Sequence, residues 1–230
     1  MKTIGMLGGM SWESTTSYYR LINEGVKQRL GGLHSASICM VSMDFGELEK
    51  LQHQGDWDAI AERLAAAARS IEAGGADFLM ICTNTMHQVA EQVEAAVSIP
   101  LLHIADATGQ QLQRSKLKKV GLLGTRFTME MDFYKARLQD HHGIEVLVPE
   151  QEARDFIHRV IYEELCLGKI REPSRERFLG IINQLRDAGA EGVILGCTEI
   201  ALLVEPQMTD VALFDTAEIH AQQAVNLALD

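Results

Sequence analysis

Polar side chains follow four apolar runs of the chain, at the points where each run gives way to a helical pattern. The first half contains Gly8-Gly9-Met10-Ser11 and Thr83-Asn84-Thr85, and the second half contains Gly124-Thr125-Arg126-Phe127-Thr128 and Gly196-Cys197-Thr198-Glu199. Where a strand runs into a helix, backbone N–H groups and hydroxyls converge and can hold an anion. These segments therefore predict an anionic ligand. For either glycine turn taken alone, a tight connection between strand and helix that binds no ligand is the alternative. Neither the full G-x-G-x-x-G pattern nor a P-loop is present, so a nucleotide site is not predicted.

Cys197 is the thiol best suited to chemistry, because it directly follows an apolar run and is flanked by a glycine, a hydroxyl and a carboxylate. A helix N-terminus can lower the pKa of a thiol from its usual ~8.5, which would make a base or a nucleophile. A neutral cysteine packed at the strand end is the alternative. The other thiols, Cys39, Cys82 and Cys166, lie in apolar or helical patterns that favour core packing. No C-x-x-C pair and no histidine at zinc spacing is present, so neither a metal site nor a disulfide framework is predicted.

Short apolar runs alternate with helical patterns along the chain. We expect buried strands at 3–7, 36–42, 78–81, 100–104, 119–123, 144–148, 193–195 and 211–214. We expect helices at 14–30, 56–73, 86–96, 106–115, 129–140, 150–166, 174–188 and 216–229. Strands separated by helices predict βαβ units and parallel sheets. Ligands of such sheets bind beyond the carboxyl ends of the strands, which is where the polar segments fall.

The chain also repeats itself. The similar pairs of segments are 2–9 with 118–125, 73–85 with 187–199, and 101–110 with 212–222. Two copies of one α/β design predict two domains. We place the first domain at 1–100 with 215–230 and the second at 101–214, with the final helix returning to the first copy.

The repeat aligns the strand ends residue by residue. Without a gap, Thr83 falls opposite Cys197, and Cys82 falls opposite Gly196. Neighbouring residues of a strand point to opposite faces of the sheet. We therefore expect Thr83 to occupy the position of Cys197 and Cys82 to point away from it; a bulge that restores Cys82 is the alternative.

The composition excludes several classes of function. The 230 residues carry a net charge of −11, from 21 Lys and Arg against 32 Asp and Glu, which argues against non-specific binding to nucleic acid or to an anionic membrane. No apolar run approaches the ~18 residues of a membrane-spanning helix, and the N-terminus is a poor secretory signal. We expect a soluble, cytoplasmic protein. An acidic small-molecule substrate remains compatible, because a pocket needs only local donors.

These motifs resemble those of the aspartate/glutamate racemase family. The resemblance rests on the Gly-Gly-Met-Ser turn, the strand end with Asn84-Thr85 and the Gly-Cys-Thr-Glu segment, and it covers essentially the whole chain. It implies an α/β fold of two pseudo-symmetric domains, each a parallel-sheet α/β sandwich, with the active site in the cleft between them. It further implies an amino-acid substrate, no pyridoxal phosphate or other cofactor, no metal, and a homodimer. In the family, one cysteine from each domain faces the α-carbon: one removes the proton and the other returns it on the opposite face.

The chain departs from the family at one catalytic position. The family's first catalytic cysteine immediately precedes the Asn-Thr pair, where this chain has Thr83. A threonine hydroxyl is too weak an acid to be ionised at neutral pH, although it can donate or relay a proton. The second-domain cysteine of the family, matched here by Cys197, deprotonates the L-enantiomer. With Thr83 and Cys197 as the catalytic pair, we expect a racemase that acts mainly on L-aspartate and L-glutamate and handles the reverse direction poorly.

The resemblance also implies substrate contacts. The residues that match the family's positions for the two carboxylates and the amino group are Met10, Ser11, Asn84, Thr85, Thr125, Thr128 and Thr198. Lys169 matches a lysine that binds the side-chain carboxylate, with a solvated helix-end lysine as the alternative. Gln52 lies near a position where aspartate-specific members have an arginine, and a neutral side chain there would leave room for glutamate. Glu199 would orient an amino group or a proton carrier.

Two other functions stay open. The chain could be a single-cysteine decarboxylase or isomerase of the same superfamily, since arylmalonate decarboxylases also keep only the second-domain cysteine. It could also be a non-catalytic module that binds acidic amino acids, with Thr83 marking lost activity. Asn84-Thr85 and Lys169 suit an amino dicarboxylate better than an aryl group. His87, one turn after Thr83, could tune the site, but a position on a helix surface is the favoured interpretation.

Overall fold

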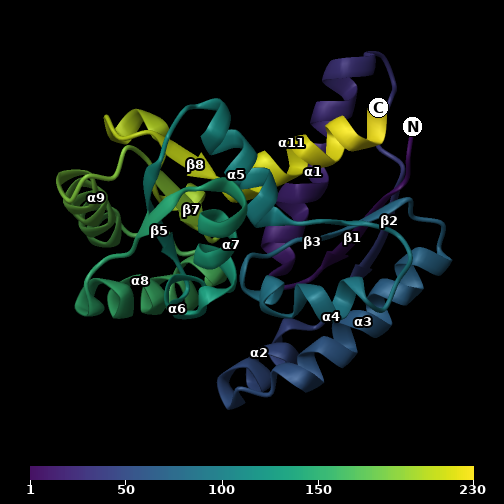
Figure 1. Cartoon of the computed structure of the whole chain (residues 1–230), viewed down its shortest axis with the longest axis horizontal. Coiled ribbons are helices and arrows are strands. Elements are labelled where there is room, and N and C mark those ends of the chain that lie inside the picture. The colour runs from purple at the N-terminus through teal and green to yellow at the C-terminus, as the bar shows by residue number, and fades with distance from the viewer. The chain divides into compact units, whose positions relative to one another are not determined.

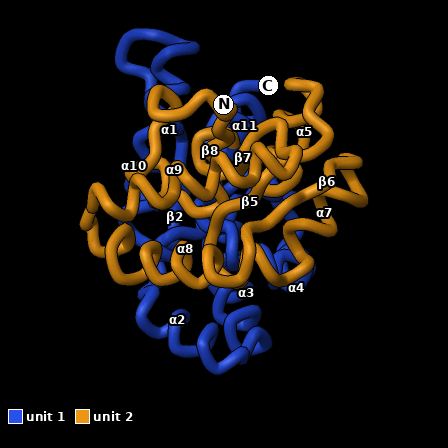
Figure 2. The backbone as a smooth tube through the Cα atoms, turned by 90° about the vertical axis from the view of Figure 1, so that its left-hand side faces the viewer, with its two compact units in different colours: residues 1–104, 220–230 blue, residues 105–219 orange.

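The apolar runs form two parallel sheets of four strands each, one in each of two compact units. A computed structural model describes all residues, 1–230, and its units comprise residues 1–104 with 220–230 and residues 105–219 (Figure 2). The boundaries expected after residues 100 and 214 lie four and five residues earlier than these. Two contacts explain the difference. Leu101 and Leu102 pair with the first sheet, and the Thr216 hydroxyl donates a hydrogen bond of 2.9 Å to the Leu195 carbonyl of the second unit.

The first unit has the strand order β2-β1-β3-β4, with the two central strands buried along their whole length. Its strands are β1 (Ile4–Gly8), β2 (Ile38–Ser42), β3 (Phe78–Ile81) and β4 (Leu101–Leu102). Its helices are α1 (Trp12–Leu30), α2 (Phe45–Gln54), α3 (Trp57–Ala73), the 3-10 helix η1 (Thr85–Val89), α4 (Ala90–Glu94) and most of α11 (Thr216–Leu229) (Figure 1). Leu7 and Ile81 share one core cluster with Leu64 and Ile71 of α3. This burial fixes β1 and β3 beneath α3.

The second unit has the strand order β6-β5-β7-β8, which is the order of the first unit over again, as the sequence repeat predicts. Its strands are β5 (Lys119–Gly124), β6 (Glu145–Leu147), β7 (Val193–Gly196) and β8 (Leu213–Asp215). Its helices are α5 (Ile104–Arg114), α6 (Arg126–Glu130), α7 (Asp132–His142), α8 (Gln151–Glu163), η2 (Leu165–Leu167), α9 (Glu172–Asp187), α10 (Ile200–Leu203) and η3 (Pro206–Met208). The expected α/β class with parallel sheets is confirmed.

Several short elements differ from the expected ones. Helix α2 was not expected, although Asp44 caps its first turn by accepting a hydrogen bond of 3.0 Å from the Gly46 N–H. The helix expected at 86–96 is the 3-10 helix η1 followed by the short helix α4. The helix expected at 129–140 is divided between α6 and α7 because Met131 adopts an extended conformation. No helix of the chain combines the length and the apolar character needed to cross a membrane.

The turn after β1 depends on a glycine. Gly9 has a φ of +90°, and a Cβ added there would collide with the Met43 carbonyl oxygen. Its N–H donates to the Thr15 hydroxyl at 2.7 Å, and that hydroxyl donates to the Ser11 carbonyl at 2.9 Å. Gly9 therefore allows β1 to turn sharply into α1 while a neighbouring chain segment passes close by.

Gly9→Ala should destabilise the first unit by about 3 kcal/mol or more, because it combines a positive φ with a backbone collision. Gly55→Ala is the matched control, since Gly55 has a φ of +74° with nothing within 4 Å of an added Cβ. The control should cost about 1–2 kcal/mol. Urea unfolding followed by tryptophan fluorescence measures both, because Trp12 and Trp57 lie in this unit. Equal losses for the two variants would show that the Met43 backbone does not constrain the turn.

Candidate active site

Cys197 lies at the carboxyl end of β7, next to a buried carboxylate. Its thiol donates a hydrogen bond to the Glu199 carboxylate at 2.9 Å, and the Thr198 hydroxyl donates to the same oxygen at 2.8 Å. Glu199 is 4% exposed and Cys197 is partly buried. The predicted residues Cys197, Thr198 and Glu199 therefore form one hydrogen-bonded group.

The Cys197 thiol is protonated in this environment. Burial, the Glu199 carboxylate and Cys166 together raise its pKa well above the usual value. The expectation that a helix N-terminus lowers this pKa is wrong, because α10 has only four residues and the carboxylate opposes the thiolate. The thiol becomes a base only after its proton has moved to an acceptor, and Glu199 is the acceptor in contact.

Two threonines accompany Cys197 at the same edge of the second sheet. The last residues of β5 and β7 are ladder partners, Gly124 with Gly196. Thr125 follows Gly124 and caps α6, and its hydroxyl lies 3.2 Å from that of Thr128. Both threonines are buried. A side chain at Gly124 would lie 3.1 Å from the Gly196 carbonyl oxygen, so the glycine keeps the two strand ends close.

Lys169 and Asp215 lie in the same unit as Cys197. Lys169 is exposed on the loop that follows η2, and its N–H donates to the Glu164 carbonyl at 2.9 Å. Asp215 ends β8, beside Leu195 of β7, and sequence reasoning did not select it. Burial raises its pKa to about 6, and Glu199 contributes to that shift. No sequence signal marks it, because the ladder register makes Asp215 the counterpart of His103, whereas Asp106 of the first copy lies within α5.

The first unit contains the other predicted residues, most of which directly follow β1 or β3. Ser11 caps α1, accepting a hydrogen bond of 3.3 Å from the Ser14 N–H. Asn84 and Thr85 are buried directly after β3. Gln52 is 2% exposed on α2. Met10 packs its side chain into the core cluster of this unit, so only its backbone is suited to hold a substrate.

The two ladders test the alignment of Thr83 with Cys197. Leu7 of β1 pairs with Ile81 of β3, and Leu123 of β5 pairs with Leu195 of β7. Each residue of interest thus follows its paired strand residue by two positions: 81 to 83, and 195 to 197. The register predicted from the repeat is confirmed.

Burial separates Cys82 from Thr83. Cys82 is 0% exposed, and its N–H extends the ladder by donating to the Leu7 carbonyl at 2.9 Å. Burial raises the pKa of the Cys82 thiol. Thr83 is partly exposed. There is no bulge that turns Cys82 outward, so Thr83 has the more accessible of the two side chains.

His87 is buried, and its interpretation as a helix-surface residue is wrong. It is 3% exposed, and its Nδ1 atom lies 2.8 Å from the Thr83 carbonyl oxygen. Its ring centroid lies 4.4 Å from that of His103 and 6.1 Å from that of His220. Sequence reasoning missed this cluster because its members come from three distant segments.

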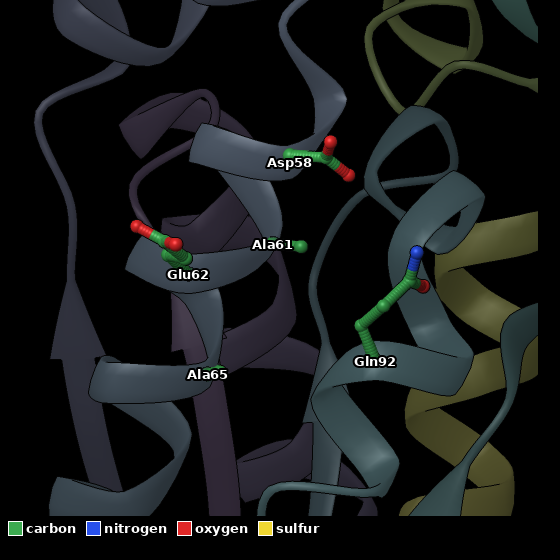
Figure 3. A pocket seen from close by; sticks show the side chains of 5 residues that line it. All are labelled: Asp58, Ala61, Glu62, Ala65 and Gln92. Atoms are coloured by element: carbon green, nitrogen blue, oxygen red, sulfur yellow. The ribbon is translucent and has the colours of Figure 1, made fainter.

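A surface hollow of about 430 Å³ lies elsewhere in the first unit. It is lined by Asp58, Ala61, Glu62 and Ala65 of α3 and by Gln92 of α4 (Figure 3). None of these is a predicted site residue. The lining carries two carboxylates and no cation, so it is unsuited to an acidic substrate.

Comparison with known proteins shows the family of the chain. Residues 7–224 match the family model for Asp/Glu/hydantoin racemase. A crystal structure of a protein assigned as an Asp/Glu racemase from Yersinia pestis is 53% identical, covers 100% of both chains and has a TM-score of 0.94. An aspartate racemase homologue from Pyrococcus horikoshii OT3 is 34% identical over 100% of both chains, with a TM-score of 0.87. The broad specificity amino-acid racemase RacX of Bacillus subtilis (strain 168) is 21% identical over 98% of each chain. The chain therefore belongs to the Asp/Glu/hydantoin racemase family.

Proposed function

We propose that this chain is a cofactor-independent racemase of acidic amino acids, acting on L-aspartate and L-glutamate, with Cys197 and Thr83 as its two proton carriers. The register equivalence of these two residues carries the proposal, because it assigns them the same position at the ends of β3 and β7. Family membership supports racemase chemistry. The proposal includes a homodimer in the cytoplasm.

The resting hydrogen bond suggests how Cys197 becomes a base. The thiol proton passes to the Glu199 carboxylate, along the contact of 2.9 Å, and leaves a thiolate. The thiolate takes the α-proton of the L-amino acid and becomes a thiol again, while the substrate becomes a carbanion. On the opposite face the Thr83 hydroxyl gives its proton to the carbanion while it takes one from a water molecule, which yields the D-enantiomer without an alkoxide, and Glu199 then releases its extra proton to the resulting hydroxide. Hydroxyls and N–H groups at the strand ends stabilise the carboxylate charge that grows during this step.

Thr83 makes the proposed reaction asymmetric. A thiolate is accessible near neutral pH once Glu199 accepts the proton, whereas a threonine alkoxide is not. Because the two enantiomers have equal free energy, kcat/KM for net racemisation must be equal in both directions. The preference for the L-enantiomer therefore concerns proton exchange and the separate kcat values. A carbanion formed by Cys197 should be reprotonated by Cys197 more often than through Thr83.

Cys197→Ser should lower the conversion of L-glutamate to D-glutamate by about 100- to 10,000-fold, because it removes the general base. Cys82→Ala is the matched control and should convert at close to the wild-type rate, since that thiol is buried in the core. Chiral chromatography of timed reactions without added cofactor measures both. Loss of conversion in Cys82→Ala but not in Cys197→Ser would contradict the assignment. Wild-type binding of L-glutamate with no conversion would favour the non-catalytic module.

Glu199→Gln should lower the pKa of the Cys197 thiol, because a neutral amide no longer opposes the thiolate. Burial persists, so the pKa should remain above that of a free cysteine. Alkylation of Cys197 at a series of pH values, followed by peptide mass spectrometry, should therefore show the rise in rate at lower pH than in the wild type. Glu205→Gln, at an exposed position of the same unit, makes the same charge change and should leave the profile unaltered. An unchanged profile in Glu199→Gln would refute the contact.

A further inference from the structure

We propose that His87 is a positioning residue for Thr83: its ring holds the Thr83 carbonyl and so sets the direction of the hydroxyl at the end of β3. The consequence for catalysis rests on the proposed function, but the positioning itself does not. His87 does not act on the substrate in this account. It acts through the backbone of the residue that does.

Two backbone groups fix the protonation of the ring. The Thr83 carbonyl oxygen, 2.8 Å from Nδ1, can only accept a hydrogen bond, so Nδ1 must carry a proton. The Ile104 N–H, 3.2 Å from Nε2, can only donate, so Nε2 must be without one. His87 is therefore neutral and in a single tautomer, and it ties the end of β3 to the first residue of α5.

The surroundings keep the ring in that state and orientation. Burial and the neighbouring rings of His103 and His220 lower the pKa of His87 well below its usual value. His220 is itself held, with Nε2 2.8 Å from the Leu102 carbonyl oxygen and Nδ1 3.1 Å from the Tyr18 hydroxyl. Because the His87 ring is neutral and packs against the fixed ring of His220, it keeps one pattern of hydrogen bonds.

Comparison of the two units shows what His87 replaces. In the second unit the carbonyl of Cys197 accepts a hydrogen bond of 3.0 Å from the backbone N–H of Ile200, at the start of α10. In the first unit the corresponding bond lies one residue later: the backbone N–H of His87 donates to the Asn84 carbonyl at 3.1 Å. The Thr83 carbonyl is bound by the His87 side chain. The carbonyl that follows β7 is thus held by a main-chain N–H, whereas the carbonyl that follows β3 is held by a side chain, which mutation can change.

Asparagine and glutamine variants separate the two contacts of the ring. The amide nitrogen of His87→Asn lies near the position of Nδ1 and can still donate to Thr83. The amide of His87→Gln reaches the position of Nε2, so it keeps the Ile104 contact and loses the Thr83 contact. Both variants are neutral at every working pH. They therefore exchange the two contacts: His87→Asn keeps the contact with Thr83, and His87→Gln keeps the contact with Ile104.

The test uses Thr83→Cys as the parent, because a thiol at this position allows α-proton exchange from D-glutamate to be followed in deuterated water. Adding His87→Gln should slow exchange from D-glutamate by about 10- to 100-fold, the effect of a small misplacement. Adding His87→Asn should retain most of the exchange from D-glutamate. Exchange from L-glutamate, which depends on Cys197, should be unaffected in both and serves as the folding control.

A second readout does not depend on activity. The rate at which iodoacetamide alkylates the thiol introduced by Thr83→Cys, followed by peptide mass spectrometry, should change with His87→Gln and not with His87→Asn. Unchanged D exchange and unchanged alkylation in His87→Gln would overturn the proposal. Equal losses of L and D exchange in both variants would also overturn it, since they indicate a general structural role. If no variant exchanges either enantiomer, the proposed function fails, and the alkylation rates alone decide the role of His87.

Discussion

The parallel pairing of β1 with β3 determines which side chain is accessible at the end of β3 in the first unit. Leu7 pairs with Ile81, and the ladder continues through the N–H of Cys82, so Cys82 points into the core and Thr83 does not. A shift of one residue would exchange these two positions. The same pairing in the second unit leads to Cys197. Two equivalent strand ends therefore present a hydroxyl and a thiol.

Glu199 determines how that thiol behaves. A thiol beside a buried carboxylate is a poor thiolate at rest, yet in the proposed mechanism the same carboxylate accepts the thiol proton and so makes a thiolate possible. This arrangement protects Cys197 from unwanted reactions, since the thiolate is the reactive form. Thr83 has no comparable partner in the proposal. Under the proposed function, the chemistry at the two faces of the substrate is therefore unequal, because the thiol can be ionised and the hydroxyl cannot.

Much of the fold could be predicted because its signals are local or repeated. The alternation of apolar and helical segments predicted the α/β fold class, and the internal repeat predicted the alignment of Thr83 with Cys197. Helix α2 was missed because it depends on the Asp44 cap more than on a long apolar pattern. The burial of His87 could not be predicted, since its partner Ile104 lies seventeen residues further along the chain. The pKa of Cys197 was predicted in the wrong direction because sequence alone does not show where the Glu199 carboxylate points.

The most direct test of the unequal pair is to compare α-proton exchange with racemisation in deuterated water. L- and D-glutamate are supplied separately to the wild-type protein, exchange is followed by NMR, and the enantiomers are separated by chiral chromatography. We expect L-glutamate to exchange its α-proton faster than it racemises and D-glutamate to exchange slowly, and we expect Cys197→Ser to abolish exchange from L-glutamate. Equal rates of exchange from both enantiomers, with racemisation as fast as exchange, would contradict the unequal roles of Cys197 and Thr83.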